Sequence, residues 1–258
     1  QGTINSILNL TPATGAAAKP FVLDRKKVTE LKNNGWRVNF GDDTDSITEK
    51  EMVELYKKIM GEFDLQEYGN EIEQALNKQG IKITDKVFAI RSKTAQIMQS
   101  NSDGTTVIHR EIHYDPSTGQ RNVSHQTLKI KEELQGKGLS RELLKVMYKQ
   151  YKKAGVKEIV LMANMEVGGY AWAKYGFHVP REEVDYVEFS NETHYLKYKQ
   201  AADKYFRDNP RAESFPMRII ADQSWGKEAL LKSLWGGFLD LTDRAAVKTF
   251  ENYLFNRR

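Results

Sequence analysis

Cysteine is absent from this chain of 258 residues, and its absence removes several kinds of chemistry. Without a thiol the protein can form no disulfide, no thiol nucleophile and no zinc–thiolate site. Long hydrophobic runs are absent too, because none approaches the roughly 20 residues that a membrane-spanning helix needs. No signal-peptide pattern is visible. We therefore expect a cytoplasmic protein without membrane association.

The usual short motifs for nucleotides and metals are also missing. Neither the Walker pattern GxxxxGKS/T nor GxGxxG occurs in the sequence. The acidic segment FGDDTDS lacks the spacing and the closing glutamate of an EF-hand. We interpret it as a turn before a helix that Thr48 caps, with Glu51 completing a capping box. The sequence therefore predicts no metal cofactor.

The charge balance excludes little. The chain has 39 Lys and Arg against 35 Asp and Glu, which gives a net charge of +4. Such a charge permits an acidic partner without requiring one. The first residue is Gln1 rather than Met, which indicates a fragment or a processed product.

The region from Leu128 to Gly155 contains the clearest pattern in the chain. Hydrophobic residues and lysines alternate from Leu128 to Lys131, as in a strand with one buried face. The segment QGKGLS follows, and apolar residues then recur every three or four positions as far as Tyr151, which is typical of an amphipathic helix. Gly155 is placed to end that helix as a C-cap. The region predicts a strand, a glycine-bearing loop and a helix.

A loop of this kind suits phosphate binding. Gly136 and Gly138 let the backbone curl so that several N–H groups point into one concavity. The helix that starts directly behind them adds the positive end of its dipole. A plain strand-to-helix turn needs glycine for its angle as well, so the loop alone leaves both interpretations open.

The flanking sequence predicts the rest of a mixed α/β domain. Helical spacing precedes residue 80, and from residue 81 short β-rich runs are separated by turn residues at 101–104 and 115–119. The apolar run 156–163 is typical of a strand buried on both faces. The predicted order is helices, an antiparallel meander, and then strand, loop, helix and strand.

The segment LKIKEELQGKGLSRELL resembles the acetyl-CoA loop of the GCN5-related N-acetyltransferase (GNAT) superfamily. That family has an L-x-V strand followed by Q/R-x-x-G-x-G/A and a helix. Gln135, Gly136 and Gly138 match the pattern, and Ser140 stands where Gly or Ala is usual. KEIVLMAN resembles the fifth strand of the family, and GGYAWAKYGFHV resembles its next helix and closing strand. The resemblance covers roughly residues 85–190, and the tryptophan-rich segment after it resembles GNAT-like modules of phage and mobile-element proteins.

The resemblance implies an α/β (α+β) fold with a mixed, mainly antiparallel sheet and helices on both faces. We predict an N-terminal arm or linker over 1–47, a GNAT-like domain over 48–190, and a helical extension over 191–258 that packs on the core. Within the extension we expect helices over 191–209 and 225–235. Gly236 and Gly237 should end the second helix, and Thr242 should cap a third.

The resemblance also implies a set of cofactor-binding residues. In the family, backbone N–H groups of the loop hold the pyrophosphate of acetyl-CoA. The strand before the loop is splayed from the next strand and pairs with the pantetheine arm. A backbone N–H of that strand polarises the thioester carbonyl, as in an oxyanion hole. The matching residues in this sequence, together with two that follow the next strand, are Leu128, Lys129, Ile130, Gln135, Gly136, Lys137, Gly138, Leu139, Ser140, Asn164 and Trp172.

Proton transfer needs separate groups. In many relatives a tyrosine four residues before the glycine of the GF pair acts as the general acid. In this sequence Trp172 occupies that position. Tyr170 is the candidate to replace it, unless the reaction proceeds without that acid. For the base, Glu111 and His113 share one face of a predicted strand and are the first choice, ahead of His125.

We therefore predict an acetyl-CoA-dependent N-acetyltransferase that acts on an amine of a protein or another large acceptor. The missing tyrosine and the absent initial Met motivate an alternative, a GNAT-fold binding or structural module without turnover that is carried in a phage particle or secreted as an effector. The basic residues of the helix after the loop motivate another, an acyltransferase for aminoacyl-tRNA. We interpret those residues as a solvated helix face and expect no nucleic-acid partner. The sequence leaves the acceptor and the oligomeric state open.

Overall fold

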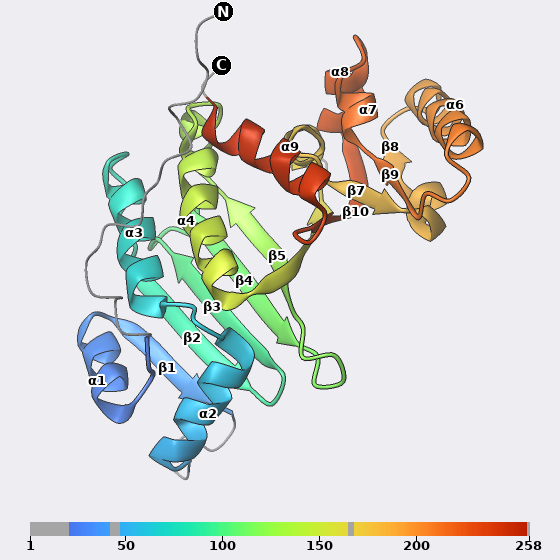
Figure 1. Ribbon diagram of the computed structural model, residues 1–258. Helices are drawn as coiled ribbons and strands as arrows, with labels where there is room; N and C mark the ends of the chain where they lie inside the picture. Colours follow the sequence, from blue (N-terminus) through green and yellow to red (C-terminus); the bar gives the residue numbers. More distant parts are fainter. Residues whose placement is uncertain (1–20, 42–46, 165–167, 257–258) are drawn as a thin grey trace, which may run out of the picture.

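The computed structural model describes residues 21–41, 47–164 and 168–256 of the chain (Figure 1). A ten-stranded sheet runs through these residues. Its strands, in spatial order, are β1 (Trp36–Phe40), β2 (Asp85–Arg91), β3 (Thr94–Ser100), β4 (Val107–Tyr114), β5 (Arg121–Lys129), β6 (Val156–Ala163), β10 (Ser233–Asp240), β7 (His178–Pro180) and β9 (Ser214–Pro216), and β8 (Glu188–Phe189) pairs with β10.

Most neighbouring strands are antiparallel, and the exceptions define the architecture. β1 pairs parallel to β2, and β5 pairs parallel to β6. β2 to β5 form the predicted meander, whose turns lie between residues 100 and 107 and between 114 and 121. The mixed, mainly antiparallel sheet confirms the predicted fold class.

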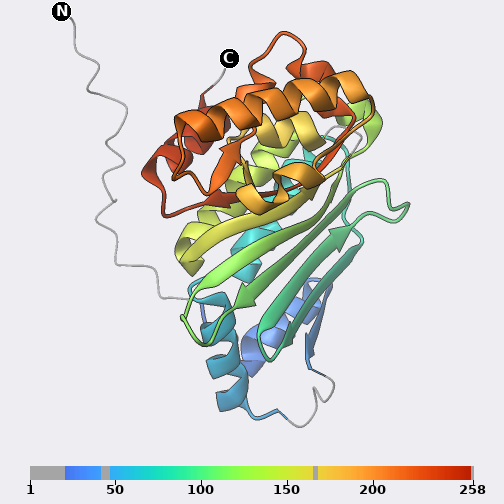
Figure 2. The ribbon, with the colours of Figure 1, turned by 90° about the vertical axis from the view of Figure 1, so that its right-hand side faces the viewer.

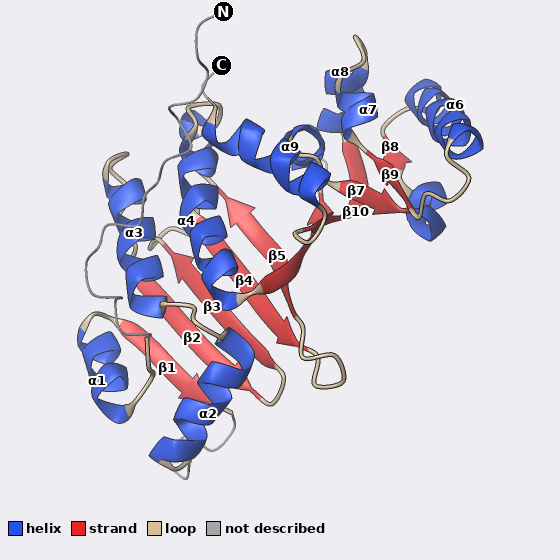
Figure 3. Cartoon of the chain, viewed as in Figure 1, coloured by secondary structure: helices blue, strands red, loops and turns tan. Residues whose placement is uncertain are grey.

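The helices occupy the connections between strands (Figure 3). They are α1 (Arg25–Asn33), α2 (Glu49–Met60), α3 (Leu65–Asn77), α4 (Leu139–Ala154), α5 (Gly168–Lys174), α6 (Glu192–Asp208), α7 (Arg218–Ala221), α8 (Gly226–Leu231) and α9 (Arg244–Phe255), with 3-10 turns η1 (Glu132–Leu134) and η2 (Arg181–Tyr186). The predicted capping box at the start of α2 is present, because Thr48 and Glu51 bond each other's backbone N–H. Gly155 ends α4 with φ of 69°, as a C-cap glycine should.

The two faces of the meander are unlike. On β4, Ile108, Arg110 and Ile112 are buried on the face that α2, α3 and α4 cover. Val107, His109, Glu111 and His113 point to the opposite face. Figure 2 looks toward that opposite face, and no helix crosses in front of β2 to β5 there. We call it the open face of the sheet.

The structure differs from the prediction at both ends of the chain. The segment predicted as an arm contains α1 and β1, and β1 adds a strand to the sheet edge. Residues 11–20, which suggested a linker, lie outside the described residues, as do Asp42 to Ser46 of the acidic turn. Short patterns of four or five residues, such as the alternation WRVNF, are easily overlooked beside a longer irregular segment.

The C-terminal segment is not only helical. α6 occupies the predicted place, but Gly236 and Gly237 lie inside β10 instead of ending a helix. β10 is inserted between β6 and β7, so the sheet is completed by residues 233–240 and not by the strand after Phe177. Asp243, and not Thr242, caps α9 through bonds to the N–H groups of Ala245 and Ala246.

Candidate functional site

The parallel strands β5 and β6 separate before they end. Their paired residues run from Arg121 and Val156 to His125 and Leu161. β5 then continues to Lys129 and β6 to Ala163 without pairing to each other. β5 has a bulge at this point. His109 of β4 pairs with Thr127, and the next residue, Arg110, pairs with His125, so Gln126 of β5 has no partner residue on β4. The result is an opening between two central strands.

The glycine loop lies at the wide end of this opening. Gly136 and Gly138 have φ of 74° and 83°, values that a residue with a Cβ adopts only with strain. A Cβ built on either glycine would meet no atom within 4 Å, so the space beside both is open. The Gln135 side chain donates to the carbonyl oxygen of Ile130 at 3.1 Å and closes the loop back onto the strand end.

The start of α4 supplies hydrogen-bond donors to the same place. In the described part of the chain, no backbone carbonyl accepts from the N–H groups of residues 136–140. Gly138 caps the helix without a side-chain bond, so no side chain occupies the positive end of this 16-residue helix. Free N–H groups, two positive-φ glycines and a helix dipole fit a pyrophosphate.

These observations agree with the fold that the resemblance implied. The order is helices, antiparallel meander, a strand that leaves its neighbour, glycine loop, helix and parallel strand. The chain has a GNAT-like fold.

Comparison with known proteins adds little to this assignment. No family model matches the sequence, and no curated protein matches it significantly. Similar solved structures include a GNAT family acetyltransferase from Elizabethkingia anophelis with acetyl-CoA bound, at 14% identity over 58% of this chain and 77% of that chain, with a TM-score of 0.29. Another is the NatC complex bound to Gag peptide and CoA, at 11% identity over 57% of this chain and 70% of that one, with a TM-score of 0.28. Likeness at this level assigns no activity to this chain.

The predicted cofactor residues fall into two groups around the GNAT-like opening. Leu128, Lys129 and Ile130 form the separated end of β5 and the residue after it, and residues 135–140 form the loop and the start of α4. Lys137 is exposed, and no ion pair involves it among the described residues. Asn164 follows β6, and its amide oxygen would lie 3.7 Å from a Cβ placed on Gly168.

Trp172 is a packed residue. Its side chain is 9% exposed and contacts the rings of His125, Tyr175 and Phe177 at centroid distances of 5.7, 5.8 and 5.3 Å. It lies on the covered face of the sheet, next to the last paired residue of β5. Tyr170 is half-buried on the same helix α5, and no hydrogen bond joins it to Glu111 or His113 in the described residues.

Glu111 and His113 do come together, on the open face. The Glu111 carboxylate lies 3.6 Å from Nε2 of His113 and accepts hydrogen bonds from Gln96 at 2.7 Å and Gln126 at 3.0 Å. Gln126 is the unmatched residue of the bulge, so Glu111 is one side chain away from the start of the opening. His125 lies on the other face, buried, with its Nε2 2.9 Å from the hydroxyl of Tyr151.

Sequence reasoning missed two neighbours of Glu111. His109 Nε2 lies 3.7 Å from the carboxylate, and His109 faces Thr127 beside the opening, whereas His113 faces Asn122 farther from it. Strand alternation could have placed His109 on this face, because it lies two residues before Glu111. Gln126 reaches Glu111 because of the bulge in β5, and no sequence pattern predicts that bulge.

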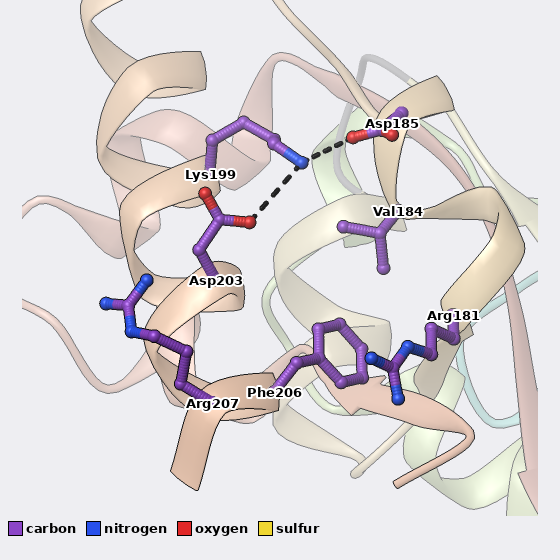
Figure 4. Close-up of a pocket in the computed structure, with 7 residues that line it drawn as sticks. All are labelled: Arg181, Val184, Asp185, Lys199, Asp203, Phe206 and Arg207. Atoms are coloured by element: carbon purple, nitrogen blue, oxygen red, sulfur yellow. Dashed lines mark hydrogen bonds and ion pairs between the residues drawn. The ribbon is translucent and has the colours of Figure 1, made fainter. Parts of the chain in front are cut away.

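A separate pocket of about 390 Å³ lies between η2 and α6 (Figure 4). Lys199 bridges Asp185 and Asp203 across it, and the Arg181 guanidinium lies over the Phe206 ring at 4.6 Å. Arg181 also donates to the carbonyl oxygens of Pro210 and Ala212. These contacts hold η2 against α6 and the chain that follows it.

No group of three or more His, Cys, Asp or Glu side chains among the described residues is arranged to hold a metal ion. No helix in residues 21–41, 47–164 or 168–256 has the length and hydropathy to cross a bilayer.

Proposed function

We propose that this protein is an acetyl-CoA-dependent N-acetyltransferase that acts on an amine of a protein or another large acceptor. The observation that carries the proposal is the separation of β5 from β6 directly beside a glycine loop whose N–H groups have no backbone acceptor among the described residues. A regular parallel pair would lose its ladder hydrogen bonds at such a separation without compensation. A ligand with amide groups along its length, such as a pantetheine arm, replaces them.

Different residues bind the phosphates, align the pantetheine arm and accept the proton. The N–H groups of residues 136–140 hold the pyrophosphate, and Lys137 is free to approach a phosphate. The end of β5 aligns the arm, so that the acetyl thioester is held near the narrow end of the opening. Glu111 is the base that accepts the proton of the acceptor amine at its carboxylate, with Gln96 and Gln126 fixing its orientation.

The open face of the sheet is the acceptor side. Figure 2 shows α6 and η2 beside this face rather than over β3 to β5, so a large acceptor can reach Glu111. His109 and His113 flank the carboxylate at 3.7 and 3.6 Å and are placed to pass its proton to water.

The test is a calorimetric titration with acetyl-CoA, followed by mass spectrometry of candidate peptide and protein acceptors. The wild-type chain should bind one acetyl-CoA, and Gly138→Asp should abolish binding, because a side chain and a negative charge would both enter the phosphate site. Gly119→Asp is the matched control, since Gly119 also has positive φ (71°) and no atom near its Cβ position but lies in the β4–β5 turn. Equal affinity in the two variants would remove the loop from the site.

The same experiment decides between this proposal and a module without turnover. The core packing of Trp172 supports that second candidate, because an indole in this position supplies no proton to a thiolate. Binding of acetyl-CoA without any acetylated product would favour it.

The basic residues of α4, which motivated the aminoacyl-tRNA alternative, contact other side chains of the protein. Lys149 and Lys153 of α4 pair with Glu67 of α3, Lys145 pairs with Glu142, and Lys152 lies 3.6 Å from Glu251. Arg141 lies over the ring of Tyr253 at 5.3 Å. Charges neutralised within the protein add little to the attraction of a polyanion.

A further inference from the structure

Arg110 of β4 is a buried cation at the narrow end of the opening. Its side chain is 1% exposed, and its Nη1 donates to the carbonyl oxygens of His109 at 2.6 Å and Thr127 at 2.5 Å. Its Nε and Nη2 have no hydrogen-bond partner among the described residues. No carboxylate pairs with Arg110 in the part of the chain that the structure describes. An unpaired charge inside a protein is strongly unfavourable, which makes its position here informative.

The groups around Arg110 leave its charge uncompensated. Tyr68 of α3, Tyr151 of α4 and His125 of β5 are the titratable side chains on which it acts. Burial raises the pKa of Tyr68 to about 12 and that of Tyr151 well above its usual range, and the Arg110 charge opposes both shifts only in part. Burial lowers the pKa of His125 well below its usual value, and the Arg110 charge adds to that shift. All three side chains are therefore neutral near pH 7.

One of the two peptide groups that Arg110 binds lies beside the opening. The carbonyl of Thr127 points toward β4, where Arg110 binds it. Because peptides here are trans, the N–H of the same peptide group, which belongs to Leu128, points the opposite way. That direction is the side of β5 where pairing to β6 ended three residues before Leu128, at His125. The Leu128 N–H is thus a backbone donor aimed into the opening.

We propose that Arg110 is a positioning residue that polarises the Thr127–Leu128 peptide, so that the Leu128 N–H becomes a strong donor to the carbonyl oxygen of a bound thioester. This inference rests on the proposed function. A charged donor on a carbonyl oxygen strengthens the hydrogen bond that the N–H of the same peptide makes, because the two bonds polarise each other. Stabilisation of the thioester oxygen lowers the barrier to attack by an amine.

The test reads the thioester carbonyl directly, without turnover. Acetyl-CoA labelled with ¹³C at the acetyl carbonyl is bound to the full chain, and isotope-edited infrared difference spectroscopy records the carbonyl stretch. Wild-type protein should shift the stretch to lower wavenumber. Arg110→Lys keeps a cation and should retain most of the shift, whereas Arg110→Gln keeps a donor without charge and should lose most of it. If Arg110→Gln binds acetyl-CoA with the wild-type shift, the inference is overturned.

Two controls separate this role from a structural one. Arg121→Gln removes another arginine that donates to backbone carbonyls, those of residues 57–59, at the far end of β5. It should leave the carbonyl stretch unchanged even if the melting temperature falls. With an acceptor in hand, kcat of Arg110→Gln should fall by less than the roughly 10²–10³-fold that loss of a whole oxyanion donor causes. A wild-type chain that binds no acetyl-CoA would remove the proposed function and this inference together, whereas equal shifts in wild type and Arg110→Gln would remove the inference alone.

Discussion

At the scale of single residues, Glu111 has an environment that suits a general base, because its carboxylate is held in one orientation by hydrogen bonds. Two amide groups, from Gln96 and Gln126, donate to its oxygens and fix the carboxylate on the open face. Its side chain is 17% exposed, so water reaches it only in part. His109 and His113 stand on either side along the same strand. This is an arrangement that orients a carboxylate toward a neighbour without neutralising it by a lysine or an arginine.

Replacing Glu111 by Gln should lower kcat about 10²–10⁴-fold, the range expected for loss of a general base. Affinity for acetyl-CoA should change little, because the carboxylate lies outside the phosphate loop. Steady-state kinetics and calorimetry on the same sample measure both quantities. Asp85→Asn is a control that removes an acidic group from β2, where it pairs with Arg37, and should leave kcat unchanged. Full activity of Glu111→Gln would move the search for a base to His109.

A second prediction at this scale concerns the contribution of Trp172 to the stability of the fold. It fills space between β5 and α5, so Trp172→Ala should destabilise the fold by about 3–5 kcal/mol, as is usual for loss of a buried tryptophan. Trp172→Phe keeps the aromatic contact with His125 and should cost much less. Chemical denaturation measures both. A Trp172→Ala protein of unchanged stability would show that the indole serves the ligand rather than the core.

At the scale of elements, a polar cluster joins α4 to α3. Lys149 and Lys153 donate to the two oxygens of Glu67 at 2.8 and 2.5 Å, and Gln150 joins Glu67 to the N-cap residue Asp64. Burial would raise the Glu67 pKa, but these hydrogen bonds outweigh it and lower the pKa to about 2. The cluster fixes the orientation of the helix whose start holds the loop.

Glu67→Gln should therefore lower the melting temperature at neutral pH, and the effect should depend on pH in a defined direction. The folded-state pKa lies below the value of about 4.3 for an unfolded chain, so the stabilisation is fully present above pH 5. It is lost as the pH falls from about 4.3 toward 2, and the melting curves of the two proteins should converge there. The residue is partly exposed, so we expect a difference of only a few degrees. A gap that stays constant down to pH 3 would contradict the pKa assignment.

Elements with strong local signals were predictable, and elements defined by distant partners were not. The period of α4, its glycine C-cap and the capping box of α2 are written in neighbouring residues, and all three are present. The loop and the strand before it were predictable because the spacing of Gly136 and Gly138 is typical of a phosphate-binding loop. The bulge at Gln126 and the burial of Arg110 depend on which strands lie side by side, which no local pattern fixes.

β10 is the clearest case of that limit. Its sequence SLWGGFLD carries paired glycines, which suggest the end of a helix when read locally. In the fold those glycines allow close approach instead. A Cβ on Gly236 would lie 2.7 Å from the Glu183 carboxylate, and one on Gly237 would lie 2.4 Å from the Trp235 ring. The close approach of the Glu183 carboxylate from η2 and of the Trp235 ring explains why glycine stands at these two positions.

At the scale of the whole molecule, the C-terminal segment belongs to the same folded unit as the proposed site. β10 pairs with β6 along six residues and also contacts β7 and β8. α9 then returns to α4, where Phe250 packs on Tyr148 and Glu251 accepts from its hydroxyl at 2.8 Å. Residues 233–256 thus contact both the strand that bounds the opening and the helix that follows the loop.

A chain that ends at residue 190 should therefore fail to fold. It would leave one edge of β6 without its partner and expose Leu161 and Ala163, which are buried in the full chain. A chain that ends at residue 241 is the matched control, because it keeps β10 and loses only α9. We expect the control to remain soluble with a lower melting temperature and the shorter chain to aggregate. Size-exclusion chromatography, thermal denaturation and acetyl-CoA titration of both would decide the point. A soluble 1–190 fragment with the wild-type melting temperature would mean that β10 is dispensable to the sheet and that the site is complete without it.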